Sequence, residues 1–179
     1  MVGCVVPAGE RVLEVEDFYP AESFDVEQMA AFMRDPYVYG GINDAMAPAP
    51  ETVLIEDWLR TEQRLMTVAA MFKGHIVGYT QLYRRTSVAA ELTVGFNRYV
   101  PAVVVKAFTL YTFQAGWKSG LVTIWAVIAS DNRPARQAAY NCGFRQEARL
   151  SKAIVRSESK WGPAGVRDLI IYSVHRPEA

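Results

Sequence analysis

Residues 121–145 read LVTIWAVIASDNRPARQAAYNCGFR, and this stretch contains two consecutive structural signals. Leu121 to Ala129 is a continuous apolar run with valine, isoleucine and tryptophan, which is typical of a strand covered on both faces. Asp131 to Pro134 predicts a helix start, because it combines a preferred N-cap residue with a proline suited to the first turn. Gly143 ends this short helix. The stretch therefore predicts a buried strand followed directly by a helix.

Upstream of this stretch, the polarity pattern predicts an edge strand, two helices and a three-stranded meander. Asp25 is a predicted N-cap, and its helix should stop before Asp35-Pro36, because a proline disfavours the helical conformation in the residue before it. The turn Lys73-Gly74-His75 separates the first two strands of the meander. The predicted elements before residue 97 are a strand at 11–17, a helix at 25–34, a loop at 36–50, a helix at 51–65, and strands at 66–72, 76–83 and 87–96.

A long helix precedes the opening stretch and two strands follow it. The helix runs from Ala102 to Lys118, and its polar residues scatter around the axis without forming a broad solvated face. We therefore expect its outer side to be covered by the N-terminal segment, a second copy of the chain or another protein. Residues 145–156 and 166–174 predict a closing antiparallel pair. The order β-α-α-β-β-β-α-β-α-β-β predicts one α/β (α+β) domain over residues 1–179, a mixed sheet with helices on both faces.

Composition limits the partners of the protein. The 179 residues include 19 Lys+Arg and 19 Asp+Glu, and this zero net charge argues against nucleic acid or an anionic membrane held by bulk charge. No apolar run approaches the roughly 18 residues of a membrane span. Two cysteines, Cys4 and Cys142, and two histidines, His75 and His175, predict neither a disulfide framework nor a metal site. We expect a cytoplasmic protein, or part of a particle assembled there.

Five short motifs occur in a fixed order along residues 11–175. They are Asp35-Pro36, Gly78-Tyr79, Glu91-Leu92, the pair Asn132 to Ala135 and Gly143 to Arg145, and Asp168 to Tyr172. Together with the order of elements, they resemble the GNAT superfamily of N-acetyltransferases. The resemblance is closest to the branch that acetylates the N-termini of ribosomal proteins. It implies a three-layer fold with a splayed sheet, whose V-shaped gap accepts acetyl-CoA, and direct transfer of the acetyl group to an amine of a peptide or small molecule.

The segment that should bind the pyrophosphate of the cofactor departs from the family pattern. The family carries a glycine-rich loop before the long helix, and in this chain residues Asn97 to Val103 occupy the position of that loop. Ala102 fits the last position of the motif, but Val100 replaces a glycine and Pro101 has no N–H group. Arg98 can supply a compensating guanidinium. The alternative is a loop that only starts a helix.

The resemblance places seven candidate residues. The cofactor-binding candidates are Arg98, Ala102, Val103, Val127 and Asn132, and the catalytic candidates are Glu91 and Tyr140. Glu91 is either a general base or a surface carboxylate paired with Arg84 or Arg85. Tyr140 is either the general acid, one residue after the family position, or an aromatic anchor of its helix. Asn132 either binds the pantetheine arm or caps the helix, and a backbone N–H near Val127 would meet the oxyanion.

Two functions from different classes follow from these observations. The first is an acetyl-CoA-dependent N-acetyltransferase with an altered phosphate loop. The second is a catalytically silent protein of the same fold that serves as a structural or interaction subunit of a larger assembly, such as a virion or other particle. The altered loop and the apolar helix at 102–118 favour the second, and the whole-chain resemblance favours the first. The fold by itself does not separate them.

Overall fold

The structure is a computed structural model, and it describes residues 7–8, 11–12, 17–35, 37–38, 64–156 and 163–178. A two-stranded and a seven-stranded sheet lie within these residues. The elements are β1 (Pro7–Ala8), β2 (Arg11–Val12), β3 (Phe18–Ala21), α1 (Val26–Met33), β4 (Arg64–Phe72), β5 (His75–Arg84), β6 (Ala89–Phe96), α4 (Ala102–Lys118), β7 (Thr123–Ala129), α5 (Arg133–Asn141), β8 (Arg145–Arg156) and β9 (Gly165–His175).

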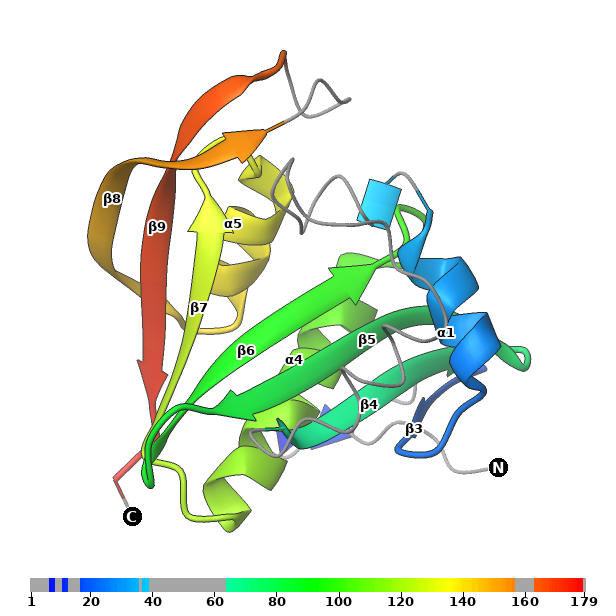
Figure 1. The fold of residues 1–179 in the computed structure, drawn as a ribbon. Coiled ribbons are helices and arrows are strands. Elements are labelled where there is room, and N and C mark those ends of the chain that lie inside the picture. The colour runs from blue at the N-terminus through cyan, green and yellow to red at the C-terminus, as the bar shows by residue number, and fades with distance from the viewer. Residues whose placement is uncertain are drawn as a thin grey trace.

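The large sheet is splayed at its centre. Its strand order is β3-β4-β5-β6-β7-β9-β8, and every neighbouring pair is antiparallel except β6 and β7. These two parallel strands pair over only three positions, from Ala89 opposite Thr123 to Glu91 opposite Trp125. Beyond Glu91 they diverge toward their carboxyl ends, as Figure 1 shows. The expected mixed, mostly antiparallel and splayed sheet is confirmed.

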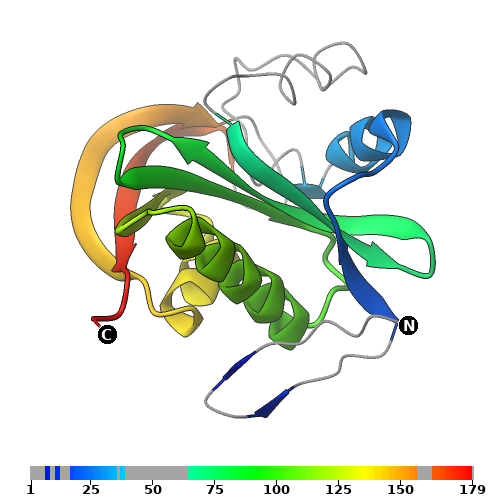
Figure 2. The same ribbon diagram turned by 90° about the horizontal axis from the view of Figure 1, so that it is seen from below.

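Helices cover both faces of the sheet and make three layers (Figure 2). Alternate residues of β5 show which helix covers which face, because successive side chains of a strand point to opposite sides. Tyr79 packs edge-on against Phe32 of α1, with ring centroids 6.3 Å apart. The next residue, Thr80, lies on the other face, where its hydroxyl is 2.5 Å from the hydroxyl of Thr112 in α4. The predicted arrangement of helices is therefore confirmed.

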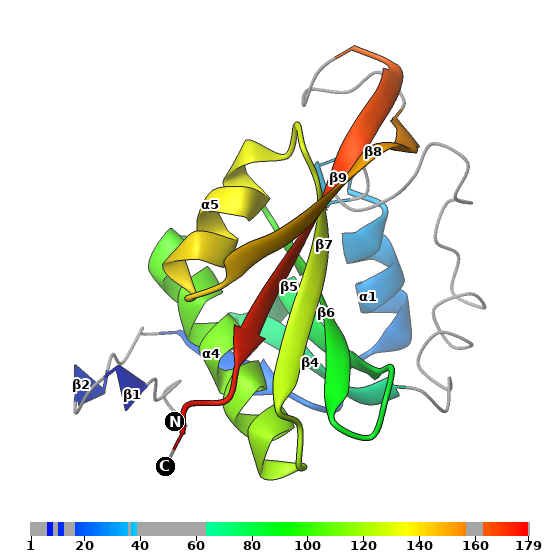
Figure 3. The ribbon, with the colours of Figure 1, turned by 90° about the vertical axis from the view of Figure 1, so that its left-hand side faces the viewer.

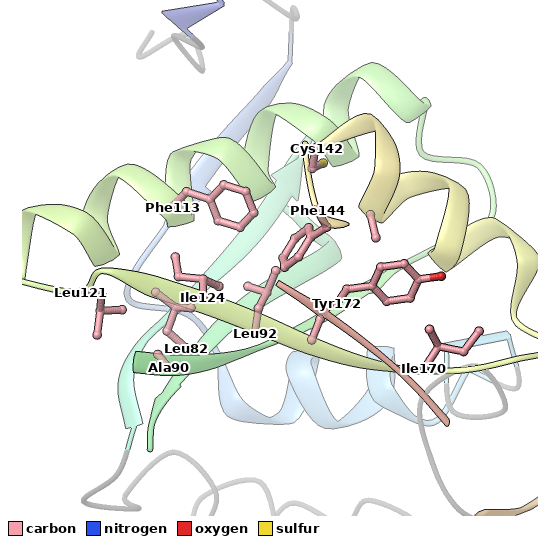
Figure 4. Packing of buried hydrophobic residues seen from close by; sticks show 12 residues of the cluster. Leu82, Ala90, Leu92, Phe113, Leu121, Ile124, Cys142, Phe144, Ile170 and Tyr172 are labelled. Atoms are coloured by element: carbon pink, nitrogen blue, oxygen red, sulfur yellow. The ribbon is translucent and has the colours of Figure 1, made fainter. Parts of the chain in front are cut away.

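The main core lies between the sheet and the helices α4 and α5. Phe113 of α4 is fully buried there, and its ring lies 5.5 Å from Trp117 and 5.2 Å from Phe144, measured between centroids. Leu82 and Ile124 bring β5 and β7 into the same cluster (Figure 4). Because one ring contacts elements that are distant along the chain, this cluster fixes how α4 sits on the splayed sheet.

The local sequence signals located most element ends. Asp25 caps α1 by accepting a hydrogen bond from the Gln28 N–H at 3.0 Å, as predicted. The helix predicted from Ala102 to Lys118 and the strand predicted from Arg145 to Arg156 have the same bounds in the structure. The short helix at 133–141 ends before Gly143, which has a φ of 89°. Glycine adopts this left-handed conformation without steric cost.

Two predicted elements were placed wrongly. Of the edge strand expected over 11–17, residues 13–16 lie outside the described residues. Arg11–Val12 form β2, Asp17 is in a turn, and the edge strand β3 begins at Phe18. β3 is shifted because Phe18 pairs with Phe72, and the two rings stack 4.6 Å apart. β4 begins at Arg64, inside the helix predicted over 51–65. The rest of that helix, and all but residues 37–38 of the loop predicted at 36–50, lie outside the described residues.

The two faces of β7 are buried to different degrees. Ile124 and Ala126 are buried toward the helices, and on the opposite face Trp125 and Val127 are half-buried while Ala129 is buried. The predicted coverage of both faces is therefore incomplete at Trp125 and Val127, which border the splay. In α4, Leu110 and Tyr111 are half-buried and pack against two core clusters, and a covering partner for the outer side of this helix stays a prediction.

Candidate functional site

A cavity of about 550 Å³ occupies the gap between β6 and β7 and extends between α4 and α5. Along Leu92 to Phe96, β6 pairs only with β5, and along Ala126 to Ala129, β7 pairs only with β9. The facing edges of the two strands therefore turn backbone N–H and C=O groups toward the cavity. Such groups require hydrogen-bond partners when they are buried. An extended ligand with its own amide groups would satisfy both edges.

Small side chains of α5 form one wall of this cavity. Ala135, Ala138, Ala139 and Cys142 all line it, and their spacing places them on one face of the helix. The sequence signal for this wall is the short residues of the motif between Asn132 and Gly143. Burial raises the pKa of the Cys142 thiol, against the opposing influence of Thr109 and Lys106. The thiol is therefore a small neutral lining group and no activated nucleophile.

The first turn of α4 stands at the open end of the cavity. Pro101 is its N-cap and supplies no side-chain hydrogen bond. Its carbonyl accepts from the N–H of Val104 at 2.9 Å and from that of Val105 at 3.2 Å. The N–H groups of Ala102 and Val103 donate to no acceptor among the described residues. Two donors at the positive end of the helix dipole thus remain for an anion.

The loop before α4 satisfies part of its own backbone. The N–H of Val100 donates to the Asn97 carbonyl at 3.0 Å, and the N–H of Tyr99 donates to the Asn97 side chain at 3.3 Å. The Val100 side chain packs against the apolar cluster that includes Val104 and Phe108. Val100, which replaces the glycine of the family pattern, is therefore anchored in the core. The loop offers fewer free backbone N–H donors than a glycine-rich loop.

Two cations reinforce this end of the cavity. Arg98 lines it and lies over the ring of Tyr99, with the guanidinium carbon 4.5 Å from the ring centroid. Arg98 also donates a hydrogen bond to the Tyr99 hydroxyl. Lys106 lines the cavity one helical turn beyond Ala102. Sequence reasoning missed Lys106, although its spacing of four residues from Ala102 could have placed it on the same side.

Glu91 lies where the two strands begin to diverge, and it lines the cavity. Its carboxylate is bridged to Arg85, with Oε2 2.6 Å from Nη2 and 3.0 Å from Nε. The ion-paired alternative for Glu91 is therefore present in the structure, with Arg85 and not Arg84 as the partner. Glu91 both lines the cavity and is paired with Arg85, so its assignment as the general base stays a prediction.

The remaining candidates divide between the cavity and the surface. Val127 lines the cavity with Glu91, Arg98, Ala102 and Asn132. Of the seven candidate residues, Val103 and Tyr140 do not line the cavity. Tyr140 is half-exposed and packs edge-on against Tyr172, with ring centroids 5.5 Å apart. This contact is compatible with an aromatic anchor of α5, and the choice between the two roles of Tyr140 stays a prediction.

Asn132 caps α5 at the edge of the cavity. Its side-chain oxygen accepts a hydrogen bond from the Ala135 N–H at 3.2 Å, and the residue is 8% exposed. We expect Asn132→Ala to lower the free energy of unfolding by about 1 kcal/mol, the usual value of an N-cap. Asn132→Ser should restore most of the stability because serine caps as well as asparagine does. Urea unfolding of the three proteins measures the effect, and equal losses in both variants would mean that capping is not the role of this side chain.

Charged side chains in the cavity wall are mostly positive. Among the described lining residues, Arg98, Lys106 and Arg156 carry positive charge, and Glu91 is the single carboxylate. Arg156, at the end of β8, is 4% exposed and also interacts with other residues of the chain. The cavity therefore favours a ligand with negative charge. Sequence reasoning missed Arg156, because nothing local distinguishes it from the exposed residues of the same strand.

Comparisons with known proteins support the fold. No family model matches the chain, and no curated protein matches its sequence. Solved structures do match. A GNAT-family acetyltransferase from Streptococcus pneumoniae superposes with a TM-score of 0.69 at 14% identity, over 89% of this chain and 99% of that one. A putative acetyltransferase from Salmonella typhimurium, solved with its cofactor acetyl-CoA, superposes with a TM-score of 0.71 at 16% identity, over 91% of this chain and 96% of that one.

A third match is the ribosomal-protein-alanine N-acetyltransferase from Brucella melitensis, with a TM-score of 0.70 at 13% identity over 88% of this chain and 99% of that one. All three matches span nearly the whole of both chains, so they concern the complete domain and not a shared fragment. The chain has the fold of the GNAT acetyltransferases.

Proposed function

We propose that this chain, which has the GNAT fold, is an N-acetyltransferase that moves an acetyl group from acetyl-CoA to an amine of a peptide or small molecule. The observation that carries the proposal is the splay between β6 and β7, with unpaired strand edges on both sides of a cavity of about 550 Å³. A pantetheine arm is extended and carries amide groups, so it suits these edges. None of the described helices is long and apolar enough to cross a membrane.

The residues at the start of α4 suit the diphosphate of acetyl-CoA. The N–H groups of Ala102 and Val103 lack acceptors in the described chain, and Arg98 and Lys106 line the same end of the cavity. Backbone donors at a helix N-terminus with nearby cations are a common phosphate-binding arrangement. Pro101 removes one donor from the set, and the two side-chain cations compensate for it. Acetyl-CoA supplies the acetyl group as a thioester.

The chemistry assigned to this chain is proton transfer and charge stabilisation. Glu91 lies at the narrow end of the cavity, where its carboxylate accepts the proton that the attacking amine loses. Backbone N–H groups on the open edge of β7 near Val127 donate to the oxyanion of the tetrahedral intermediate. No covalent enzyme intermediate is needed, because the amine attacks the thioester carbonyl directly. The tetrahedral intermediate then breaks its C–S bond, and the departing CoA thiolate takes a proton from solvent. Tyr140 has no part in this proposal.

Acetyl-CoA should raise the melting temperature of the protein. A ligand that binds only the native state at 100 times its Kd stabilises by about 2.7 kcal/mol, which corresponds to roughly 5–10 °C for a domain of this size. The Ala138→Trp variant should lose the shift, because Ala138 lines the cavity and an indole would fill it. Ala138→Ser is the matched control and should retain the shift. Differential scanning fluorimetry with and without acetyl-CoA measures both.

The silent structural subunit is the competing function, and the same measurement addresses it. Pro101 and the ion-paired Glu91 are the features that favour it. Absence of a shift in the wild-type protein at millimolar acetyl-CoA would contradict the transferase and favour the silent protein. A shift that is equal in Ala138→Trp would mean that the ligand binds outside the splayed cavity.

A further inference from the structure

A second hollow, of about 610 Å³, lies on the other side of α5 from the splayed cavity. Arg133 and Arg136 of α5 line it, with Arg149 of β8 opposite them. The two helix residues are three positions apart and share one side of α5, whereas Ala135 and Ala138 face the first cavity. Figure 3 looks onto this side of the molecule, where α5 lies next to β8. We call this site the arginine hollow.

Neighbouring groups hold two of the three guanidinium groups in place. Arg136 donates from Nε to the Tyr172 hydroxyl and from Nη1 to the Ser130 carbonyl, each at 3.1 Å. Arg149 donates from Nε to Asp168 at 2.6 Å, and its Nη2 lies 2.5 Å from the same carboxylate oxygen. Two guanidinium groups are therefore oriented before any ligand binds, which lowers the entropic cost of binding.

Asp168 is itself fixed, so the position of Arg149 does not depend on a flexible partner. Its second carboxylate oxygen accepts from the Lys152 backbone N–H at 2.8 Å. That hydrogen bond, together with Arg149, holds the pKa of Asp168 below its usual value. The carboxylate therefore stays charged at neutral pH, and the Arg149 side chain stays anchored beside the hollow.

Positive charge in the arginine hollow exceeds negative charge. Asp131 is the single carboxylate in its lining, and Asp131 is bridged to Arg167 at 3.1 Å. Asp168 balances Arg149. Arg136 has no carboxylate within ion-pair distance among the described residues, and Arg133 has neither an ion pair nor a side-chain hydrogen bond there. Two uncompensated guanidinium groups thus share one hollow, and a bound anion would relieve their repulsion.

The geometry points to a binding site for a phosphate group carried by a small molecule, held by Arg133, Arg136 and Arg149. Nη2 of Arg136 and Nη1 of Arg149 donate to no acceptor among the described residues, so they are available to a ligand. The whole guanidinium group of Arg133 is available in the same way. Three guanidinium groups from two elements suit a phosphate, whose several oxygens can each accept from a different donor. The hollow is also much larger than a single ion, so it accommodates the rest of a phosphomonoester.

Isothermal titration with inorganic phosphate, AMP and adenosine tests this site in the full chain. AMP should bind, and adenosine should bind at least tenfold more weakly because it lacks the phosphate. Arg133→Gln should weaken AMP binding about tenfold or more, the loss of one charge-assisted contact. Arg145→Gln is the matched control, since Arg145 is an exposed arginine of β8 that lines neither cavity, and it should bind AMP as the wild type does.

The Ala138→Trp variant separates the arginine hollow from the splayed cavity, where an adenine nucleotide would bind as part of CoA. AMP binding should survive this substitution. If AMP binds more tightly than inorganic phosphate, the ligand is a phosphomonoester, and if inorganic phosphate binds as tightly, the site takes free phosphate. The inference is overturned by a lack of phosphate and AMP binding, by equal binding of adenosine, by unchanged affinity in Arg133→Gln, or by loss of binding in Ala138→Trp.

Discussion

Replacing Glu91 with glutamine is expected to lower kcat about 100-fold or more, while the KM for acetyl-CoA stays unchanged. Glutamine keeps the shape of the side chain but cannot take a proton from the attacking amine, and positioned proton transfer contributes about 10²–10⁴-fold to catalysis. Glu91 lies at the narrow end of the splay, opposite Trp125. The measurement is the initial rate of CoA thiol release with the best acceptor of an amine panel.

Arg85→Gln is the control that separates proton transfer from ion pairing. It removes the bridge to Glu91 and leaves the carboxylate in the cavity. Because both partners are partly exposed, the bridge itself is worth at most about 1 kcal/mol, and neither variant should unfold. We expect Arg85→Gln to retain most of kcat. Equal losses in the two variants would assign Glu91 a structural role, and an unchanged kcat in Glu91→Gln would remove it from the mechanism.

Phe113→Ala is expected to lower the free energy of unfolding by about 3–5 kcal/mol, the usual cost of truncating a buried phenylalanine. Phe113 is 0% exposed and belongs to the core cluster that also contains Leu82 of β5 and Ile124 of β7, and its ring contacts Phe144. The alanine would leave a cavity between α4, α5 and the sheet. The melting temperature should fall by roughly 6–20 °C, as measured by circular dichroism.

Val122→Ala is the control for the stability measurement. Val122 is 49% exposed, at the turn after α4, and its truncation should change the free energy of unfolding by less than about 0.5 kcal/mol. A loss below about 1 kcal/mol for Phe113→Ala would show that α4 does not pack on the sheet through this ring. A large loss for Val122→Ala would show that the exposed turn is covered in solution.

Elements with strong local signals were predictable with nearly correct bounds. Pro101 and Gly120 bracket α4, Asp25 caps α1, and Asn132 with Pro134 starts α5. Each of these signals acts over three or four residues, through a cap, a fixed φ angle or a left-handed turn. The wrong placement of β3 arose where such a signal is missing. Its position depends on pairing with β4, more than 40 residues later in the chain.

The candidate site was predictable in part. The motif resemblance located Glu91, Arg98, Ala102, Val127 and Asn132, all of which line the cavity. The resemblance could not choose between the alternative roles of Glu91 and Asn132, because those depend on which partner lies within hydrogen-bond distance. Sequence reasoning considered both Arg84 and Arg85 for Glu91, and the structure brings only Arg85 to it.

The arginine hollow has no sequence signature. Arg133 and Arg149 belong to different elements, and nothing local indicates that α5 and β8 lie next to each other. Asp168 was singled out as part of a family motif, but its contact with the Lys152 N–H depends on the register of β8 against β9, which shifts between Leu150 and Ile154. Register is set by the whole pair of strands and not by one residue.

By itself, the sequence determined the helix ends, most of the strands and the family pattern of residues around the gap. Only the tertiary structure decided that β6 and β7 part after three paired positions, that Arg85 reaches Glu91, and that two uncompensated arginines share a hollow. Caps and turns are interactions between near neighbours, so the local sequence encodes them directly. The splay and the charge clusters arise where distant segments meet, and their positions follow from the summed packing of the core.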